Sequence, residues 1–268
     1  MSESRKDSKG SVADPLYVAS FGKILQVLRA FSGGASSMGL TEISQKTGFN
    51  ISAVQRFIYT LEKEGLVRRW QGGRRYCLAA NVIEPGFCFH QSSGWLPAAW
   101  APMGRLASDF QAEAELYVLD GGEVISLGGQ TGGDPASSLV RIGGRRMPAY
   151  CTAAGRILLS ARSDEEIRTR MSAINVTIQT PKTLISPGPI LSKIQSAALL
   201  GYAIVDQEIN MGEVAVAGMI RDPDPEAGAA LSLTLSRAHW TLNQVEEKVV
   251  PALLAATKVL SQQRGVDA

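Results

Sequence analysis

Four arginines surround one tight turn in the first third of the chain. Arg68 and Arg69 precede Gln71-Gly72-Gly73, and Arg74 and Arg75 follow it. A Gly-Gly step between two short runs of alternating residues predicts a β-hairpin. Guanidinium groups bind phosphate oxygens through paired hydrogen bonds, so this spacing favours a hairpin that contacts nucleic-acid phosphates or a minor groove. The alternative is a charged hairpin that is only solvated.

The segment before the hairpin predicts a helix with a polar outer face. Val54, Phe57, Ile58 and Leu61 form an apolar stripe at helical spacing, and Asn50 is a suitable N-cap. The opposite face and its flanks carry Ser52, Ala53, Gln55, Arg56, Tyr59 and Lys63. A short helix with a polar, net basic face suits the DNA major groove. Taken alone, the pattern also fits an ordinary amphipathic surface helix.

A shorter helical pattern that starts at Thr41 precedes this helix. Its Leu40 and Ile43 can pack on the apolar stripe, and Gly48 permits the left-handed residue that a turn between two helices needs. Gly65 predicts the end of the second helix. The whole arrangement is that of a winged helix-turn-helix. We expect base contacts from Ser52, Ala53, Gln55 and Arg56, and phosphate contacts from Thr41, Tyr59, Arg68, Arg69, Arg74 and Arg75.

The charge distribution agrees with a nucleic-acid-binding module attached to another domain. The net charge of the chain is only +2, but residues 1–80 hold 12 Lys and Arg against 6 Asp and Glu. The remaining residues hold 15 against 19, a balance of −4. A basic first third followed by an acidic remainder indicates DNA binding by the first part alone.

Residues suited to catalysis or metal binding are sparse. The three cysteines and two histidines lack zinc-ligand spacing, and an odd cysteine count argues against a disulfide framework. Asp206 and Glu208 form a close acidic pair, but no partner for them is evident. We therefore expect no enzyme activity, no cofactor and no metal. No signal peptide or membrane-spanning segment is evident, so we expect a cytoplasmic protein with no membrane partner.

The patterns divide the chain into five parts. We predict a disordered tail over 1–16, the winged helix-turn-helix over 17–79 and a linker helix, irregular at Pro85, over 80–94. A second domain follows over 95–262, and a short tail over 263–268.

The second domain combines strands with interspersed helices. A helix from Trp95 to about Gln111 precedes a predicted hairpin over 115–127, and a third strand is predicted over 138–142. Helices are expected from Ala153, after Ser163, from Ile190 to Leu200 and from about 242 to 262. Strands are expected over 202–205, 214–220 and 228–235. The fold class is therefore α+β.

Five segments in this order resemble the IclR family of bacterial transcription regulators. They are Leu40-Thr-Glu-Ile-Ser with Ser52-Ala-Val-Gln-Arg, Leu61-Glu-Lys-Glu-Gly-Leu-Val, Val118-Leu-Asp-Gly-Gly-Glu-Val, Met147-Pro-Ala-Tyr-Cys-Thr-Ala-Ala-Gly-Arg, and Gly201-Tyr-Ala-Ile-Val-Asp-Gln-Glu. The resemblance covers residues 17–262. It implies a GAF-like effector-binding domain with a central, mostly antiparallel sheet, and an assembly that is a homodimer or a dimer of dimers. The fourth and fifth segments resemble the subgroup that controls the catabolism of aromatic acids such as p-hydroxybenzoate or protocatechuate.

The resemblance also implies an effector pocket. Its candidate residues are Tyr117, Met147, Tyr150, Ala153, Ala154, Gly155, Ser232 and Thr234. Many members of the family have Asp where this chain has Val205, and Cys where it has Ala215, which implies a less polar pocket. A helix that starts near Thr152 would present free backbone N–H groups to an anion. Tyr117, Tyr150 and Cys151 also fit ordinary core positions.

Two other functions remain open on the sequence. One is a DNA-binding protein without a ligand, and the other is an enzyme domain fused to a DNA-binding module. The reading favoured here is a regulator that binds double-stranded operator DNA and responds to a small organic acid, expected to be aromatic.

Overall fold

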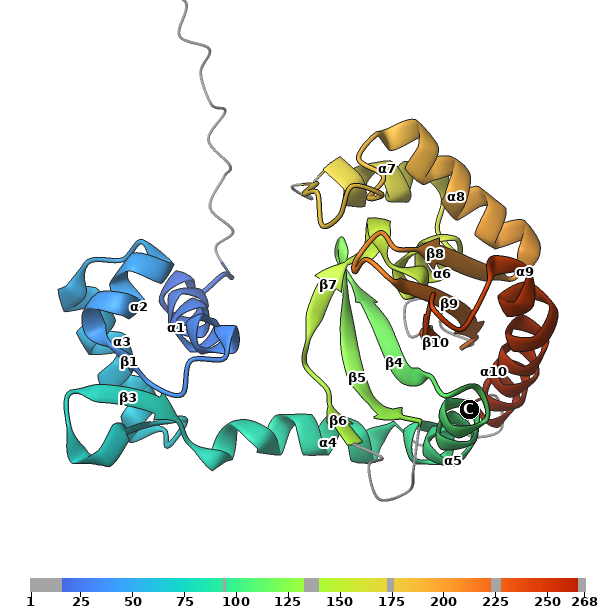
Figure 1. The fold of residues 1–268 in the computed structure, drawn as a ribbon. Coiled ribbons are helices and arrows are strands. Elements are labelled where there is room, and N and C mark those ends of the chain that lie inside the picture. Colours follow the sequence, from blue (N-terminus) through green and yellow to red (C-terminus); the bar gives the residue numbers. More distant parts are fainter. Residues whose placement is uncertain (1–15, 94, 133–139, 173–175, 223–227, 265–268) are drawn as a thin grey trace, which may run out of the picture. The chain divides into compact units, whose positions relative to one another are not determined.

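The computed structural model describes residues 16–93, 95–132, 140–172, 176–222 and 228–264. They form two compact units, and the division between Gln91 and Ser92 falls inside the predicted linker. Figure 1 shows the helices and strands of both units. The tail predicted over 1–16 falls almost wholly outside the described residues, and helix α10 continues two residues into the tail predicted from 263.

Three helices and a small sheet make up the N-terminal unit. The helices are α1 (Ala19–Arg29), α2 (Leu40–Thr47) and α3 (Ile51–Lys63), with single turns of 3-10 helix at η1 (Ala30–Gly33), η2 (Trp70–Gly72) and η3 (Ala80–Ile83). Strands β1 (Met38–Gly39), β2 (Val67–Arg69) and β3 (Arg75–Leu78) pair in the order β1-β3-β2. The predicted winged helix-turn-helix is confirmed in these elements.

Local signals in the sequence determine the two helices of the turn. Gly48 has a φ of 73°, a left-handed conformation that costs glycine little, and it ends α2. The Asn50 side chain accepts a hydrogen bond from the Ala53 amide at 2.8 Å and so caps α3. Gly65 is also left-handed, and the Leu66 amide donates to the Leu61 carbonyl at the helix end. Of the apolar stripe of α3, Val54, Ile58 and Leu61 are buried and Phe57 is half-buried against the same core.

The linker forms helix α4 (Glu84–Ser92). Pro85 lies in its first turn, where a backbone N–H has no partner within the helix in any case. The 3-10 turn η3 runs directly into α4, so the helical backbone of the linker changes its type between Ile83 and Glu84, next to Pro85, where an irregularity is predicted. The exposed side chains of Ile83, Phe87 and Phe89 give this segment an apolar surface.

An antiparallel sheet organises the C-terminal unit. Its strands are β4 (Glu113–Asp120), β5 (Glu123–Thr131), β6 (Val140–Ile142), β8 (Tyr202–Asp206), β9 (Glu213–Ile220) and β10 (Ala229–Ser236), in the order β6-β5-β4-β10-β9-β8. A further strand, β7 (Arg146–Pro148), pairs with β5. The sequence analysis missed β7. Of the third strand predicted over 138–142, residues 138 and 139 lie outside the described residues.

Helices cover both faces of this sheet and create two separate apolar cores. Helices α5 (Trp95–Phe110) and α10 (Val250–Arg264) pack on the face that bears Leu116, Val216 and Leu231. On the other face α6 (Ala153–Leu159) packs on β8, β9 and β10, and α8 (Pro187–Leu200) covers α6. Helix α7 (Asp164–Ser172) lies on the same side, as Figure 1 shows. The strand period of two separates the two cores, because alternate residues point to opposite faces.

Two helix predictions need correction. Helix α8 begins at Pro187 rather than Ile190, because proline is tolerated in the first helical turn. The terminal helix predicted from Leu242 is not uniform: a short piece, α9 (Leu242–Gln244), leads into a π-helical segment, Val245–Val249, before α10. A π-helix has about one more residue per turn than an α-helix, and the spacing of apolar residues in the sequence does not reveal so short a change.

Gly155 provides a test of the packing of α6. A Cβ at this position would lie 2.2 Å from the Ala149 carbonyl oxygen, and backbone cannot move aside as a flexible side chain can. We expect Gly155→Ala to lower the free energy of unfolding by about 1–3 kcal/mol through overpacking. The matched control is Gly188→Ala in α8, where an added Cβ meets nothing within 4 Å. Urea denaturation compares the two, and equal stabilities would contradict the assigned packing.

Candidate functional site

The outer face of α3 is exposed, as the sequence pattern requires. Ser52, Gln55, Arg56 and Tyr59 line one surface groove together with Arg69. The side chain of Tyr59 is 59% exposed, which is unusual for a tyrosine and suits a surface that meets a partner. Ala53 lies on the flank that faces α1, and Thr41 is exposed in the first turn of α2.

Two of the hairpin arginines are held by carboxylates of the helices. Arg69 pairs with Glu62 at 3.3 Å and lies over the Tyr76 ring. Arg75 pairs with Glu42 at 2.9 Å and donates to the Ser37 carbonyl at 2.7 Å. Hydrogen bonding from the Gly39 amide and from Arg75 lowers the pKa of the Glu42 carboxyl. These bonds fix the orientation of the hairpin relative to α2 and α3.

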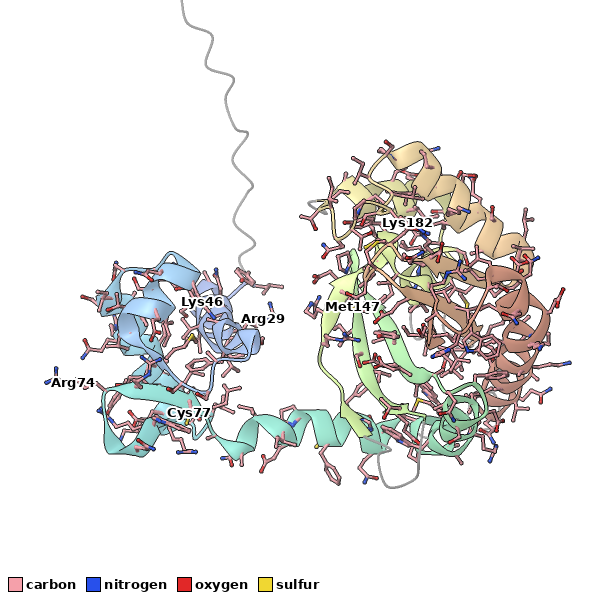
Figure 2. The ribbon with its side chains drawn as sticks, viewed as in Figure 1. Arg29, Lys46, Arg74, Cys77, Met147 and Lys182 are labelled. Atoms are coloured by element: carbon pink, nitrogen blue, oxygen red, sulfur yellow. The ribbon has the colours of Figure 1, made fainter. Side chains whose placement is uncertain are left out.

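The other two hairpin arginines extend outward. Arg68 lies over the Trp70 ring, with 6.0 Å between the guanidinium carbon and the ring centroid. Arg74 is exposed at the end of the hairpin, and Figure 2 shows it directed away from the rest of the N-terminal unit. Among the described residues, Arg69 and Arg75 of the hairpin therefore pair with carboxylates, whereas Arg68 and Arg74 do not and are better placed to meet phosphates.

A cavity of about 150 Å³ opens in the C-terminal unit between α6 and the sheet. Six of the eight predicted effector residues line it, namely Tyr117, Met147, Ala153, Ala154, Ser232 and Thr234. The other two do not. The Tyr150 side chain is buried and its hydroxyl donates to the Thr177 carbonyl at 2.6 Å, while Gly155 packs against the backbone of Ala149. Tyr150 is thus a core aromatic, one of the two roles considered for it.

Strand register explains why the cavity residues meet. Thr234 on β10 lies opposite Glu113 on β4 and opposite Ala215 on β9, and Ala215 lies opposite Val205 on β8. Four strands therefore place one residue each in a single row on the α6 side of the sheet. The row is polar at β4 and β10 and apolar at β9 and β8. The small residues of α6 lie above it, and Met147 is contributed by β7 (Figure 2).

A buried carboxylate next to the cavity was not identified from the sequence. Glu115 is only 6% exposed and accepts hydrogen bonds from the hydroxyls of Ser126 and Tyr117. Arg145 pairs with the same carboxylate at 2.9 Å and lines the cavity. Burial raises the pKa of Tyr117, and Glu115 acts in the same direction, so the phenol stays protonated as a donor. Glu115 alternates with Glu113 and Tyr117 on β4, which is the one signal that pointed to it.

Glu208 also reaches the cavity, and it corrects another expectation. Its carboxylate accepts two parallel hydrogen bonds from Arg156, at 2.6 and 2.7 Å, and the Arg156 side chain is only 1% exposed. The neighbouring Asp206 pairs with Lys182 and Arg237. The sequence analysis found no partner for this acidic pair, because its partners lie between 24 and 52 residues away.

The start of α6 differs from the anion site suggested by the sequence. Thr152 caps the helix by accepting from the Gly155 amide at 3.1 Å, and its own hydroxyl donates to the Pro148 carbonyl at 3.0 Å. One of the free amides is therefore already satisfied. The helix also has only seven residues, which limits its dipole.

Cys151 lies beneath this turn and is fully buried. Burial raises the pKa of its thiol to about 11, so little of the reactive thiolate exists near neutral pH. A structural role, rather than a sensing one, fits this environment.

In the described part of the chain, no group of three or more His, Cys, Asp or Glu side chains is placed to hold a metal ion. Within the same residues, no helix is long and apolar enough to cross a membrane.

Comparison with known proteins identifies the family to which both units belong. The IclR helix-turn-helix domain matches residues 20–70, and the bacterial transcriptional regulator IclR C-terminal domain matches residues 95–262. The chain belongs to the IclR family. A relative named the Pca regulon regulatory protein, from Pseudomonas putida, is 29% identical over 250 residues, which cover 93% of this chain and 85% of that protein.

Solved structures of IclR-family proteins share the fold. An IclR transcriptional regulator from Alicyclobacillus acidocaldarius has a TM-score of 0.79 at 24% identity, covering 92% of this chain and 99% of that one. An IclR homologue from Microbacterium hydrocarbonoxydans, complexed with 4-hydroxybenzoate, has a TM-score of 0.72 at 19% identity, covering 92% and 99%. At these identities the likeness establishes the fold only.

Family membership gives the two units of this IclR-family protein their general roles. It is a DNA-binding transcription regulator with a C-terminal domain of the effector-binding type. The individual DNA contacts expected from Thr41, α3 and the hairpin remain predictions.

Arg56 and Arg74 should differ in how they affect DNA binding. Arg56→Ala should cost about 1–3 kcal/mol of operator affinity and relax specificity at one base pair if the guanidinium binds guanine in the major groove. Arg74→Ala should weaken binding to all sequences alike and lower the salt-dependence slope by about one. Titrations of operator and random duplexes at several salt concentrations separate the two effects. If Arg56→Ala weakens random DNA as much as operator, Arg56 does not read bases.

Proposed function

We propose that this protein binds operator DNA under the control of a small organic acid with a single aromatic ring, held in the cavity between α6 and the sheet. The observation that carries the proposal is the cavity itself. It combines hydroxyl groups from Ser232 and Thr234 with a guanidinium from Arg145 and an apolar wall from Val205 and Ala215. Ligand sites in proteins commonly pair apolar walls with a few convergent polar groups.

The size of the cavity supports a ligand with one ring. Its volume of about 150 Å³ is similar to that of an engineered apolar cavity that accommodates benzene. Ala153, Ala154 and Ala215 leave this space open, because larger side chains at these positions would fill it. The aromatic class also has support from relatives, since one is named for the Pca regulon and another was solved with 4-hydroxybenzoate.

Control of DNA binding requires that the ligand distinguish two conformations of the protein. A ligand shifts operator affinity only by the difference between its affinities for those conformations, typically about 1–3 kcal/mol. The cavity is bounded by α6, by the five strands β4, β7, β8, β9 and β10, and by the β8–β9 connection. A ligand that contacts all of these elements can favour one of their relative arrangements over another.

Variants of the cavity should lose the response to effector but keep DNA binding. Ser232→Ala and Thr234→Val remove hydroxyls, and Ala154→Leu fills the space beneath α6. Each should abolish the ligand-induced change in operator affinity while leaving ligand-free operator binding near the wild-type value. The matched control is Ser236→Ala, on the same strand but outside the cavity. The measurement is operator binding by the full chain, with and without a panel of benzoates, keto acids and their amides.

Two outcomes would contradict the proposal. If Ala154→Leu responds to the effector as the wild type does, the ligand does not occupy this cavity. If no acid in the panel changes the melting temperature or the operator affinity, the protein is better described as a DNA binder without an aromatic-acid effector.

We also propose that the working protein is at least a dimer. One recognition helix covers too little DNA for the specificity that a genome requires, and a two-fold dimer doubles the site. From the sequence, the helix from Trp95 to Gln111 and the linker around Phe87 and Phe89 are the segments expected to offer apolar surface for association. In α5, Trp95 and Met103 are buried within their own unit. The exposed Ile83 and Phe87, one helical turn apart, offer the better surface.

Association should therefore depend on the linker. Light scattering of the wild type at micromolar concentration should give a mass of at least twice 28.6 kDa. Phe87→Ala should shift the equilibrium towards monomer and weaken operator binding in parallel, because it removes buried apolar area from the interface. A 28.6 kDa monomer that binds operator with full affinity would rule the dimer out.

A further inference from the structure

The cavity is not symmetric in charge, and its arginine lies at one side of it. Arg145 immediately precedes β7, and its carbonyl accepts a hydrogen bond from the Ser126 amide on β5. Val205 lies at the other side, on β8. Arg145 pairs with Glu115 on β4. Three strand spacings, or about 14 Å, separate β4 from β8. A ligand that is charged at one end therefore has a distinct orientation available to it.

Glu115 holds the Arg145 guanidinium but leaves part of it available. The Nη2 atom of Arg145 donates to the Glu115 carboxylate at 2.9 Å and to the Tyr117 hydroxyl oxygen at 3.2 Å. Among the described residues, Nε and Nη1 of Arg145 have no such partner. Its side chain is 50% exposed, in contrast to 8% for that of Glu115. Arg145 is therefore anchored at one edge, and the other edge of its planar group can receive a second carboxylate.

The remaining polar groups around the cavity are worse placed to hold an anion. Arg156 does not line the cavity, and its Nε, Nη1 and Nη2 atoms already donate to the Tyr150 carbonyl and to Glu208. Glu113 and Glu213 also line the cavity and repel a carboxylate from the positions next to them, and the charge of Glu208 is already compensated by Arg156. Because the Thr152 hydroxyl already accepts from the Gly155 amide, the start of α6 competes poorly with a guanidinium.

We propose that Arg145 is the residue that selects a carboxylate effector: its free edge binds the ligand carboxylate on the β7 side of the cavity, and the aromatic ring lies over β10 beneath Ala153 and Ala154. This inference rests on the proposed function and specifies the ligand orientation within it. A charge-assisted bond to a carboxylate is roughly twice as strong as a neutral one. The acid should therefore bind at least about tenfold more tightly than its amide.

The test uses the full chain with 4-hydroxybenzoate, benzoate and the corresponding amides as probes, measured by calorimetry. The wild type should prefer each acid to its amide. Arg145→Gln should weaken acid binding by about 10- to 100-fold and remove the preference, with amide binding little changed. The matched control is Arg146→Gln, the adjacent arginine, which pairs with Asp120 and Glu123 and does not line the cavity. It should keep the wild-type preference.

A second measurement applies to the folded wild type, in case Arg145→Gln is unstable. In nitrogen-15 spectra, 4-hydroxybenzoate but not its amide should shift the Nε–H resonance of Arg145, assigned through its loss in Arg145→Lys. If the wild type prefers acids but Arg145→Gln retains that preference, or the resonance does not move, the role of Arg145 is wrong while an acid effector stands. If the wild type shows no preference for acids, or binds no probe, the acid-effector proposal fails and this inference fails with it.

Discussion

The buried ion pair between Arg156 and Glu208 joins the parts of the C-terminal unit that enclose the cavity. Arg156 belongs to α6, and Glu208 belongs to the segment between β8 and β9. The Glu208 carboxylate also accepts from the Leu184 amide, and its carbonyl accepts from the Thr183 hydroxyl. One pair therefore links the helix above the sheet, the β8–β9 connection and the segment that precedes α8.

Burial makes this pair costly to break. Removal of one partner from a buried pair typically costs about 3–5 kcal/mol, since the other charge is left without compensation. Two parallel hydrogen bonds between planar groups also restrict the geometry more than a single contact does. Because Glu208 lines the cavity, the same pair that stabilises the fold also fixes one wall of the candidate ligand site. Because Arg156 joins Glu208 to α6, a movement of this wall must also involve α6, which packs on the sheet.

The N-terminal unit relies on a different kind of constraint. Its core is small and depends on the buried stripe of α3 against α1 and α2. The exposed ion pairs of Arg69 and Arg75 contribute little energy, as is usual for surface pairs, but they join the hairpin to the helices. The polar face of α3 is thereby left exposed beside the hairpin, and Gln55 and Arg56 of α3 line one groove together with Arg69 of the hairpin.

The sequence by itself determined the elements whose signals are local. The Asn50 cap, the left-handed Gly48 and Gly65, the stripe of α3 and the alternation of Ser232 with Thr234 all act within a few residues, so short-range spacing was enough to predict them. The winged helix-turn-helix and most strands of the second domain followed from such patterns. The resemblance to a family supplied the position of the pocket, which spacing alone did not.

Only the tertiary structure decided which polar groups meet. Glu115 and Arg145 are 30 residues apart, and Arg156 and Glu208 are 52 apart, so neither pair leaves a periodic signal in the sequence. The same limit explains why Tyr150, a plausible ring-stacking residue in sequence, is instead bound to Thr177 in the core. Burial and long-range pairing depend on how the strands align across the sheet. That alignment is set by the packing of the whole domain and not by any one segment.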